Sequence, residues 1–242
     1  MTAAKEHRQW HQERLSALYA PDGWLTLVDL IWLDSATYQI GDDPQCQIVV
    51  PEAELRGNLR IDGRGAFWQP LNGPAVTLET DRHGNPSVIH AGSHSFFLIE
   101  RDGQLALRVR NTEAPTRTGF RGIELYPFDP HWQINTQLTT DSNGPLANFP
   151  IDETTYTLRP LDSAAEVLQF VFSDLTNGRE TYGGGRFLYA QKNENGALQL
   201  DFNRAINPPC VFTPFAVCPL PPPENRLPLR ITAGEMALSD IR

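Results

Sequence analysis

The chain has 242 residues, of which 20 are Lys or Arg and 29 are Asp or Glu, so its formal net charge is −9. Hydrophobic residues make up 40% and charged residues 20%, which is typical of globular rather than disordered proteins. An acidic chain lacks the general positive charge with which proteins bind nucleic acids and anionic lipids. No segment reaches the roughly 20 apolar residues of a membrane span. We therefore expect neither a nucleic-acid partner nor a membrane partner.

The N-terminal segment MTAAKEHRQWHQER is polar, carries charges of both signs and contains no apolar run. It lacks the features of a secretory signal, and we expect a cytoplasmic protein. Residues from about Ala3 to Tyr19 contain no Gly or Pro and many good helix formers, which predicts a helix that ends before the turn-forming residues 20–23. We expect this helix to pack against the β core that follows it.

Short apolar or alternating segments separated by turn residues follow from Trp24 to about residue 115. This pattern favours an antiparallel β-sandwich or barrel over alternating strands and helices, and we take the sandwich as the prediction. The clearest hairpin is FFLIERDGQLALRV, in which two β-rich runs meet at Asp102-Gly103, a dipeptide that favours two-residue turns.

A second series of strand-like segments begins near Gly119 and predicts another antiparallel sheet or a half-barrel. After Asn203 the periodicity stops, and residues 206–229 contain eight of the 20 prolines together with many apolar residues. Prolines exclude this segment from a sheet interior, and its apolar content indicates an ordered, packed loop. The predicted fold class is mainly β, divided into an N-terminal helix (1–19), a sandwich half (20–115) and a second β half with its covering loop (116–242).

The densest group of polar residues is the turn 179–186, RETYGGGR. Three consecutive glycines, Gly183, Gly184 and Gly185, allow a ligand to approach the backbone closely. Tyr182 and Arg186 flank them, and the guanidinium of Arg186 could bind a carboxylate or phosphate. The alternative is structural: a glycine-rich bulge before a strand, with Glu180 and Arg186 in an ion pair.

Further polar residues follow on the predicted strand and in the proline-rich loop. We include Asn203, Asn207 and Asn225 as ligand-binding candidates, and Glu180, Asp201 and Glu224 as candidate general bases. Asp201 and Asn203 lie two residues apart on the predicted strand, so their side chains share one face. They could orient a substrate, or they could cap the following loop by binding its backbone.

The residue patterns favour neither a metal nor a cofactor. His90 and His94 are four residues apart on a predicted strand, which separates them by about 13 Å, and no zinc, calcium or phosphate-loop motif is present. Cys210 and Cys218 could form a disulfide in an oxidising compartment, whereas in the cytoplasm free, packed thiols are expected.

Residues 38–51, YQIGDDPQCQIVVP, resemble the opening of a forkhead-associated domain, a β-sandwich family that binds phosphothreonine. The chain departs from that family where the phosphate is bound. Asp42 stands in place of the arginine, and residues 54–60 lack the family's Ser-Arg-x-x-His element. The resemblance implies the sandwich shape without phosphothreonine recognition.

Longer segments resemble a second family, the uncharacterised bacterial and archaeal family called domain of unknown function 1684. The segments are DGWLTLVDLIWL (22–33), FRGIELYPFDPHW (120–132), GRETYGGGRFL (178–188), LDFNRAINPPC (200–210) and CPLPPPENRL (218–227). The resemblance extends from Trp10 to Glu235 and implies that both halves form one family unit. It implies no particular activity.

Three functional hypotheses follow. The first is a site in the second β half for a polar or anionic small molecule, with acid–base catalysis by the carboxylates named above. The second is a non-catalytic protein-interaction module that uses the forkhead-like sandwich near residues 42–51. In the third, the glycine turn and the proline-rich loop serve only the fold. The sequence does not predict the oligomeric state.

Overall fold

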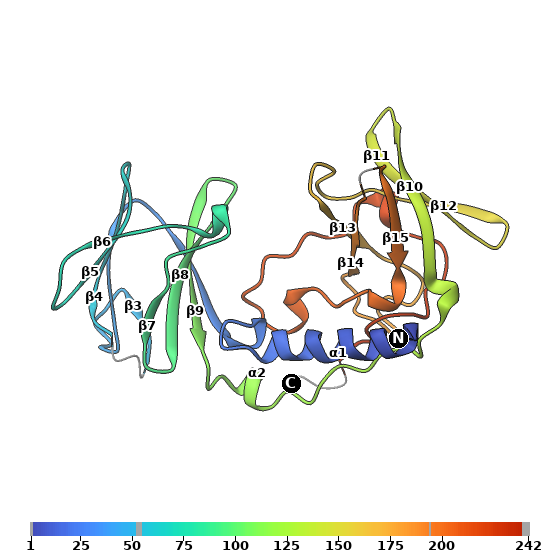
Figure 1. Cartoon of the computed structure of the whole chain (residues 1–242). Coiled ribbons are helices and arrows are strands. Elements are labelled where there is room, and N and C mark those ends of the chain that lie inside the picture. The colour runs from blue at the N-terminus through green and yellow to red at the C-terminus, as the bar shows by residue number, and fades with distance from the viewer. Residues whose placement is uncertain (1, 52–54, 194, 239–242) are drawn as a thin grey trace. The chain divides into compact units, whose positions relative to one another are not determined.

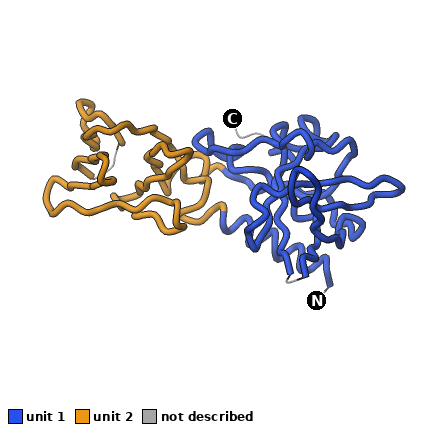
Figure 2. Tube along the Cα trace, turned by 90° about the horizontal axis from the view of Figure 1, so that it is seen from above, with its two compact units in different colours: residues 1–17, 120–242 blue, residues 18–119 orange. Residues whose placement is uncertain are grey.

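The computed structural model describes residues 2–51, 55–193 and 195–238. The chain forms two compact units (Figure 2). Unit 1 contains residues 1–17 and 120–242, and unit 2 contains residues 18–119. No helix in the described part of the chain is long and apolar enough to cross a membrane. As predicted, the fold is mainly β with a helix at the N-terminus (Figure 1).

Unit 2 consists of two sheets whose facing sides share one hydrophobic core. One sheet has the strand order β1-β9-β8-β7 and the other β3-β2-β4-β5-β6, and core residues such as Leu59, Leu98 and Leu107 come from both. Its elements are η1 (Trp24–Thr26), β1 (Leu27–Leu33), β2 (Thr37–Gly41), β3 (Ile48–Val49), β4 (Gly57–Asp62), β5 (Gly65–Pro70), β6 (Val76–Leu78), η2 (Asp81–His83), β7 (Ile89–Ala91), β8 (His94–Arg101), β9 (Gln104–Asn111) and α2 (Pro115–Thr118). The predicted sandwich is therefore present.

The hairpin predicted at Asp102-Gly103 is confirmed. Strands β8 and β9 are antiparallel, and Arg101 is paired with Gln104 across the two-residue turn. Both turn residues have positive φ, 52° at Asp102 and 78° at Gly103, which is the requirement of the turn type that matches the twist of paired strands.

Unit 1 contains α1 and six strands. Four strands form a sheet in the order β12-β11-β10-β15, and β13 and β14 form a separate antiparallel pair. Its elements are α1 (Ala3–Tyr19, whose last two residues belong to unit 2), η3 (Pro130–Trp132), β10 (Gln133–Asp141), β11 (Gly144–Ile151), β12 (Thr154–Leu158), β13 (Val167–Phe172), β14 (Arg186–Gln191), β15 (Ala197–Asp201), η4 (Phe202–Arg204), η5 (Pro209–Val211) and η6 (Pro223–Asn225).

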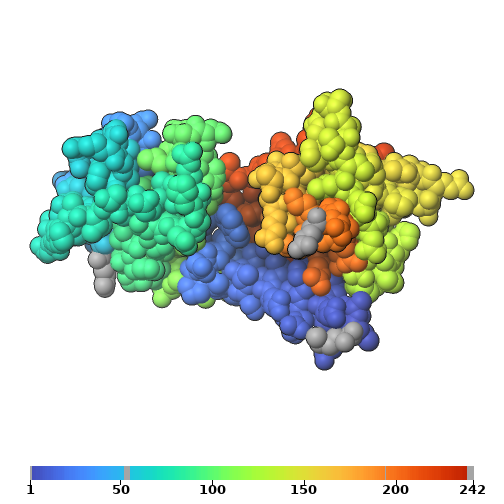
Figure 3. Space-filling model, turned by 45° about the horizontal axis from the view of Figure 1, so that its top comes forward, coloured from blue at the N-terminus to red at the C-terminus, as the bar shows by residue number. Residues whose placement is uncertain are grey.

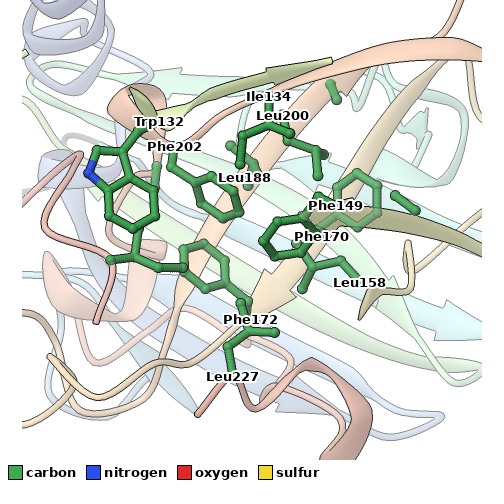
Figure 4. Close-up of a cluster of buried hydrophobic side chains, with 14 of the residues drawn as sticks. Trp132, Ile134, Phe149, Leu158, Phe170, Phe172, Leu188, Leu200, Phe202 and Leu227 are labelled. Carbon is green, nitrogen blue, oxygen red and sulfur yellow. The ribbon is translucent and has the colours of Figure 1, made fainter. Parts of the chain in front are cut away.

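The core of unit 1 is rich in aromatic side chains (Figure 4). Phe202 is fully buried, and its ring packs edge-on against Trp132 and Phe172 with centroid distances of 6.0 and 5.5 Å. Leu227, from the proline-rich segment, belongs to the same core. This core fixes the strand ends from which the candidate site residues project.

The proline-rich segment is an ordered part of unit 1, as predicted. It contains the short helices η5 and η6 and the buried residues Phe212 and Leu227. The amide of Leu227 donates a hydrogen bond to the carbonyl of Ser173 at 2.7 Å, and the amide of Ser173 donates to the carbonyl of Asn225 at 3.1 Å. Residues between the prolines therefore pair with the chain just after β13.

The N-terminal helix has the predicted bounds, but the partner predicted for it is wrong. Residues 1–17 belong to unit 1 rather than to the β core that follows them in sequence. His7 Nε2 lies 2.8 Å from the carbonyl oxygen of Asn203, and Arg14 Nε donates to Glu235 Oε1 at 3.0 Å. The opposite side of the helix, with Lys5 and Arg8, is exposed (blue in Figure 3).

Candidate functional site

Arg186, the first residue of β14, lies fully buried beneath the glycine turn. Its Nη2 donates to Asp174 Oδ1 at 3.2 Å and to the carbonyl of Ile231 at 3.0 Å, and its Nη1 donates to the carbonyl of Ala233. The guanidinium also lies 5.1 Å from the centre of the Phe172 ring. Burial lowers the pKa of Arg186, and the Asp174 carboxylate opposes that effect.

These contacts correct two predictions about Arg186. Its terminal nitrogens bind the protein itself, so the guanidinium does not face an open anion site. Its ion-pair partner is Asp174 rather than Glu180. The arrangement joins the end of β13 to the segment that contains Ile231 and Ala233, which is a structural role.

Asp174 is the central residue that the sequence reasoning missed. Besides Arg186, its carboxylate accepts hydrogen bonds from the amide of Ile231 at 2.7 Å and from the hydroxyl of Thr176 at 2.9 Å. The Thr176 hydroxyl in turn lies 2.9 Å from that of Thr181, and both threonines are buried. The available signal was a lone carboxylate directly after an apolar strand.

Two of the three turn glycines are required by close packing. A Cβ at Gly185, where φ is +99°, would lie 2.5 Å from Pro221 Cγ and 2.8 Å from the carbonyl oxygen of Phe172. A Cβ at Gly184 would lie 2.5 Å from Cε1 of the Tyr182 ring. Gly183 is exposed, so it is the glycine at which a ligand could reach the turn.

Asp201 and Asn203 are buried, but only Asp201 caps the following residues, because its Oδ1 accepts from the amide of Asn203 at 3.2 Å. Asn203 lies in η4 and not on the strand, so the two side chains do not share a strand face as predicted. Asp201 Oδ1 accepts from the side chain of Asn203 at 3.0 Å, and its Oδ2 accepts from Gln133 Nε2 at 3.0 Å. Asn203 accepts from the amide of Asp129 at 3.0 Å and donates to the carbonyl of the same residue at 2.9 Å. These contacts fix the chain before β10 against the end of β15.

The side chains of Asn207 and Asn225 also bind backbone groups of segments distant in sequence. Asn207 donates to the carbonyl of Met236 at 2.8 Å. Asn225 accepts from the amide of Arg159 at 2.8 Å and donates to the carbonyls of Arg159 and Val171 at 2.9 and 2.8 Å. Both asparagines are fully buried.

Glu180 lies at the surface of the turn, and its partners are not Arg186 but Tyr126 and Arg230. It accepts hydrogen bonds from the Tyr126 hydroxyl at 2.9 Å and from Arg230 Nη2 at 2.7 Å. These two donors hold the pKa of Glu180 below its usual range. Burial, followed by the Glu180 carboxylate, raises the pKa of Tyr126 to about 12.

The three candidate general bases are not brought together. Among the residues that the structure describes, Glu180, Asp201 and Glu224 have no hydrogen-bond or ion-pair partner in common. Glu224 is exposed, and its nearest cation is the Arg159 guanidinium at 3.8 Å. These contacts give no support to a joint acid–base role of the three carboxylates.

A cluster of thiol and phenol groups lies beside the turn instead. Cys210, in η5, and Cys218 are thiols rather than a disulfide, and both are partly exposed. The amide of Cys210 donates to the sulfur of Cys218 at 3.3 Å, and the Tyr182 hydroxyl lies 3.7 Å from the sulfur of Cys210. Hydrogen bonding with Cys218 and Tyr182 lowers the pKa of Cys210 to about 6, although burial acts in the opposite direction.

Metal binding finds no support in the part of the chain that the structure describes. It contains no group of three or more His, Cys, Asp or Glu side chains arranged to hold a metal ion.

In the forkhead-like segment of unit 2, the Asp42 carboxylate forms an ion pair with the Arg56 guanidinium at 2.9 Å. A cavity of about 310 Å³ lies near the forkhead-like segment and is lined by Val28, Asp29, Val49, Val50, Pro51, His94, Val109 and Asn111.

Comparisons with known proteins match the second half of the chain. The model of a family described as a protein of unknown function (DUF1684) matches residues 144–236. The resemblance to this family is therefore confirmed over a segment that includes Tyr182, Cys210 and Cys218. The segments at 22–33 and 120–132 lie outside it, and the forkhead-associated resemblance is not confirmed.

One similar structure is the solution NMR structure of an uncharacterised protein from Haloarcula marismortui. It is 27% identical over an alignment that covers 50% of this chain and 78% of that chain, with a TM-score of 0.43. No curated protein matches the chain.

Proposed function

We propose that unit 1 binds and reacts with a small polar electrophile, and that the thiolate of Cys210 is the nucleophile. The observation that carries this proposal is the position of the Cys210 sulfur. It is partly exposed and is held between the Tyr182 hydroxyl, at 3.7 Å, and Cys218. Reactive cysteines occur in such partly exposed surroundings that stabilise the thiolate.

The ionisation of the candidate groups favours the thiol over the carboxylates. A nucleophile or base works best when its pKa lies near the working pH. Cys210, with a pKa of about 6, is mostly thiolate at neutral pH. Glu180, whose pKa is lowered by Tyr126 and Arg230, is a weak base there, and both of its oxygens already accept hydrogen bonds.

Tyr182 is the residue that positions and stabilises the thiolate in this proposal. Its ring packs against Gly184, which leaves no room for a side chain at that position. Its carbonyl accepts a hydrogen bond from the Asn177 side chain. In the structure the Cys210 thiol donates to the Tyr182 hydroxyl; once the thiol is ionised, rotation of the hydroxyl lets the phenol donate to the thiolate.

The sequence predicted a polar or anionic ligand, and the only reason to expect a negative charge on it was the Arg186 guanidinium. That guanidinium is buried and bound to Asp174 and to two backbone carbonyls. The proposed ligand is therefore defined by its electrophilic atom and by its polar character near the exposed Gly183, and not by negative charge.

The pH dependence of alkylation tests this function. With iodoacetamide as the probe, the modification rate of Cys210 is expected to rise with a midpoint near pH 6, compared with about 8.5 for an ordinary thiol. The rate is followed by peptide mass spectrometry. Tyr182→Phe removes a hydrogen-bond donor to the thiolate and should move the midpoint upward.

The controls separate Cys210 from the other thiols. Cys46→Ser should leave the profile unchanged, whereas Cys210→Ser should abolish the component with the low midpoint. A midpoint near 8.5 for Cys210, or a low-pH component that survives in Cys210→Ser, contradicts the proposed function.

We propose a second candidate function for unit 2, in which its cavity binds a branched apolar side chain of a partner. The cavity has about 310 Å³, at the lower end of the range for ligand pockets. Its apolar lining comes from four valines and Pro51, and Asp29, His94 and Asn111 provide polar contacts. The volume and this lining support an amphipathic ligand.

NMR titration of the full chain tests the second candidate. N-acetyl-leucinamide should shift the amide signals of β1 and β9, and the polar N-acetyl-aspartamide should not. Val49 is 40% exposed, so Val49→Phe can narrow the cavity without disturbing the core and should abolish the shifts. Equal shifts with both probes, or shifts that persist in Val49→Phe, count against this function.

A further inference from the structure

Cys218 helps to hold the Cys210 sulfur in the function proposed above, but its own thiol does no chemistry there. The sulfur of Cys218 accepts a hydrogen bond from the Cys210 amide at 3.3 Å, and the Cys218 thiol also hydrogen-bonds to the Cys210 sulfur. Both side chains are partly exposed. Two adjacent, accessible thiols can do chemistry that one thiol cannot, because the second can displace a group bound to the first.

We propose that Cys210 and Cys218 form a reversible disulfide by exchange with low-molecular-weight disulfides, an activity that rests on the thiol nucleophile proposed for Cys210. In this assignment Cys210 is the attacking cysteine and Cys218 the resolving cysteine. The substrate class is a small disulfide, RSSR, whose sulfur is the electrophilic atom.

The exchange takes place in two balanced steps. First, the Cys210 thiolate attacks one sulfur of RSSR, the S–S bond of the substrate breaks, and RS⁻ leaves and takes up a proton. Second, Cys218 loses its proton and attacks the Cys210 sulfur of the mixed disulfide. The Cys210–SR bond breaks, and a second RS⁻ leaves and is protonated. In total, the two protein thiols are oxidised by two electrons and one RSSR is reduced to two RSH.

The loop between the cysteines is held in place before any reaction. The amide of Phe212 donates to the carbonyl of Pro209 at 3.0 Å, and the amide of Phe215 donates to Thr213 Oγ1 at 3.2 Å. The buried Phe212 ring packs edge-on against Phe120 with a centroid distance of 6.1 Å. These contacts order the first part of the loop, and the amide of Cys210 itself donates to the Cys218 sulfur at 3.3 Å, so the second displacement needs little rearrangement of the backbone.

Different features of the pair suit the two cysteines to different steps. Tyr182 lies beside Cys210, and the lowered pKa of that thiol makes it the one that is ionised near neutral pH. The attacking thiol in disulfide exchange reacts best when its pKa is close to the ambient pH. Cys218 is assigned as the second nucleophile because it lies beside Cys210, whose sulfur is part of the mixed disulfide after the first step.

The test uses the reduced full-length chain and oxidised glutathione as the probe. Intact-mass spectrometry should show the loss of two hydrogen atoms with no glutathione retained, and peptide mapping should link residues 210 and 218. Of the three cysteines, only Cys46 should then react with a thiol reagent. Dithiothreitol should restore all three thiols.

Single variants assign the two steps. Cys218→Ser should retain one glutathione on Cys210, because the resolving thiol is missing. Cys210→Ser should react with glutathione at least about tenfold more slowly at pH 6 to 7, because it lacks the ionised thiol. Cys46→Ser should behave as the parent chain does. Circular dichroism of each variant confirms that it is folded.

The tyrosine beside the pair provides a second readout. Hydrogen bonding to Cys210, together with burial, raises the pKa of Tyr182 in the reduced chain. Disulfide formation removes the thiolate, so the titration of Tyr182 should move to lower pH. The shift is measured as the difference in ultraviolet absorbance between the parent chain and Tyr182→Phe.

The outcomes distinguish this inference from the function on which it rests. If Cys210 is alkylated with the low midpoint but the parent chain keeps bound glutathione and forms no internal disulfide, the thiol function stands and the exchange activity is overturned. If Cys210 shows neither the low midpoint nor exchange, both fail. An internal disulfide that links Cys46 to either partner also overturns the assignment.

Discussion

Arg186 shows how burial changes the role of a charged residue. In the sequence it follows three glycines and suggests an anion site. In the structure the guanidinium is withdrawn from water, and a buried charge is tolerated only when it is paired and hydrogen-bonded. Asp174 and the carbonyls of Ile231 and Ala233 provide those partners. The same contacts hold the glycine turn on which Tyr182 lies.

This arrangement predicts a large effect of removing Asp174. Asp174→Ala leaves the Arg186 charge buried without its counter-ion, and we expect a loss of about 3–5 kcal/mol in the free energy of unfolding. Urea unfolding measures it. Asp174→Leu combined with Arg186→Met removes both charges and should lose less than Asp174→Ala alone.

An exposed ion pair in unit 2 is the matched control. Arg60 and Asp62 are 2.6 Å apart, and the Arg60 side chain is 45% exposed. Asp62→Ala should therefore change the unfolding free energy by no more than about 1 kcal/mol. If Asp174→Ala falls within the same limit, the buried pair does not have the role assigned to it.

At the scale of elements, local signals in the sequence were sufficient for α1 and for the β8–β9 hairpin. The helix has good helix formers over its whole length, and Pro21 prevents its continuation. The hairpin turn needs two residues with positive φ, and Asp102-Gly103 meets that need. In both cases, residues close in sequence determine the geometry.

Strand β11 (Gly144–Ile151) contains two prolines and was not among the strand-like segments of the sequence. Prolines normally exclude a segment from a sheet, and β11 lies between β10 and β12. Its pairing explains the exception. Residues 144–147 pair with β10, and residues 147–151 pair with β12. Pro145 and Pro150 therefore each lie where the strand has a single pairing partner.

The candidate site was predicted in part. The sequence identified the glycine turn and the proline-rich loop, because several glycines and prolines in a row stand out without any structure. The partners of the site residues could not be predicted. Arg186 binds carbonyls at residues 231 and 233, and every residue has a carbonyl. The contact between Tyr182 and Cys210 likewise depends on how the turn packs against η5.

At the scale of the whole molecule, each unit has its own hydrophobic core. We expect residues 18–119 alone to unfold cooperatively on heating, because the sandwich core lies within that segment. Residues 120–242 alone should not, since they lack the contacts of His7 and Arg14 with Asn203 and Glu235. Adding a synthetic peptide of residues 2–19 should restore cooperative unfolding.

Differential scanning calorimetry of the two fragments, with and without the peptide, measures these transitions. A version of the peptide with Arg14→Met is the control and should restore less of the transition, because Glu235 then lies buried without its cation. Cooperative unfolding of 120–242 without any peptide contradicts this prediction.

The division of unit 1 into two stretches of chain also determines the order of events during synthesis. Glu235 lies 221 residues after Arg14, so at about 5–20 residues per second it is synthesised roughly 10 to 45 s later. The sandwich of residues 18–119 is completed within that interval. The segment that forms α1 is therefore synthesised well before the residues that His7 and Arg14 contact in the folded unit.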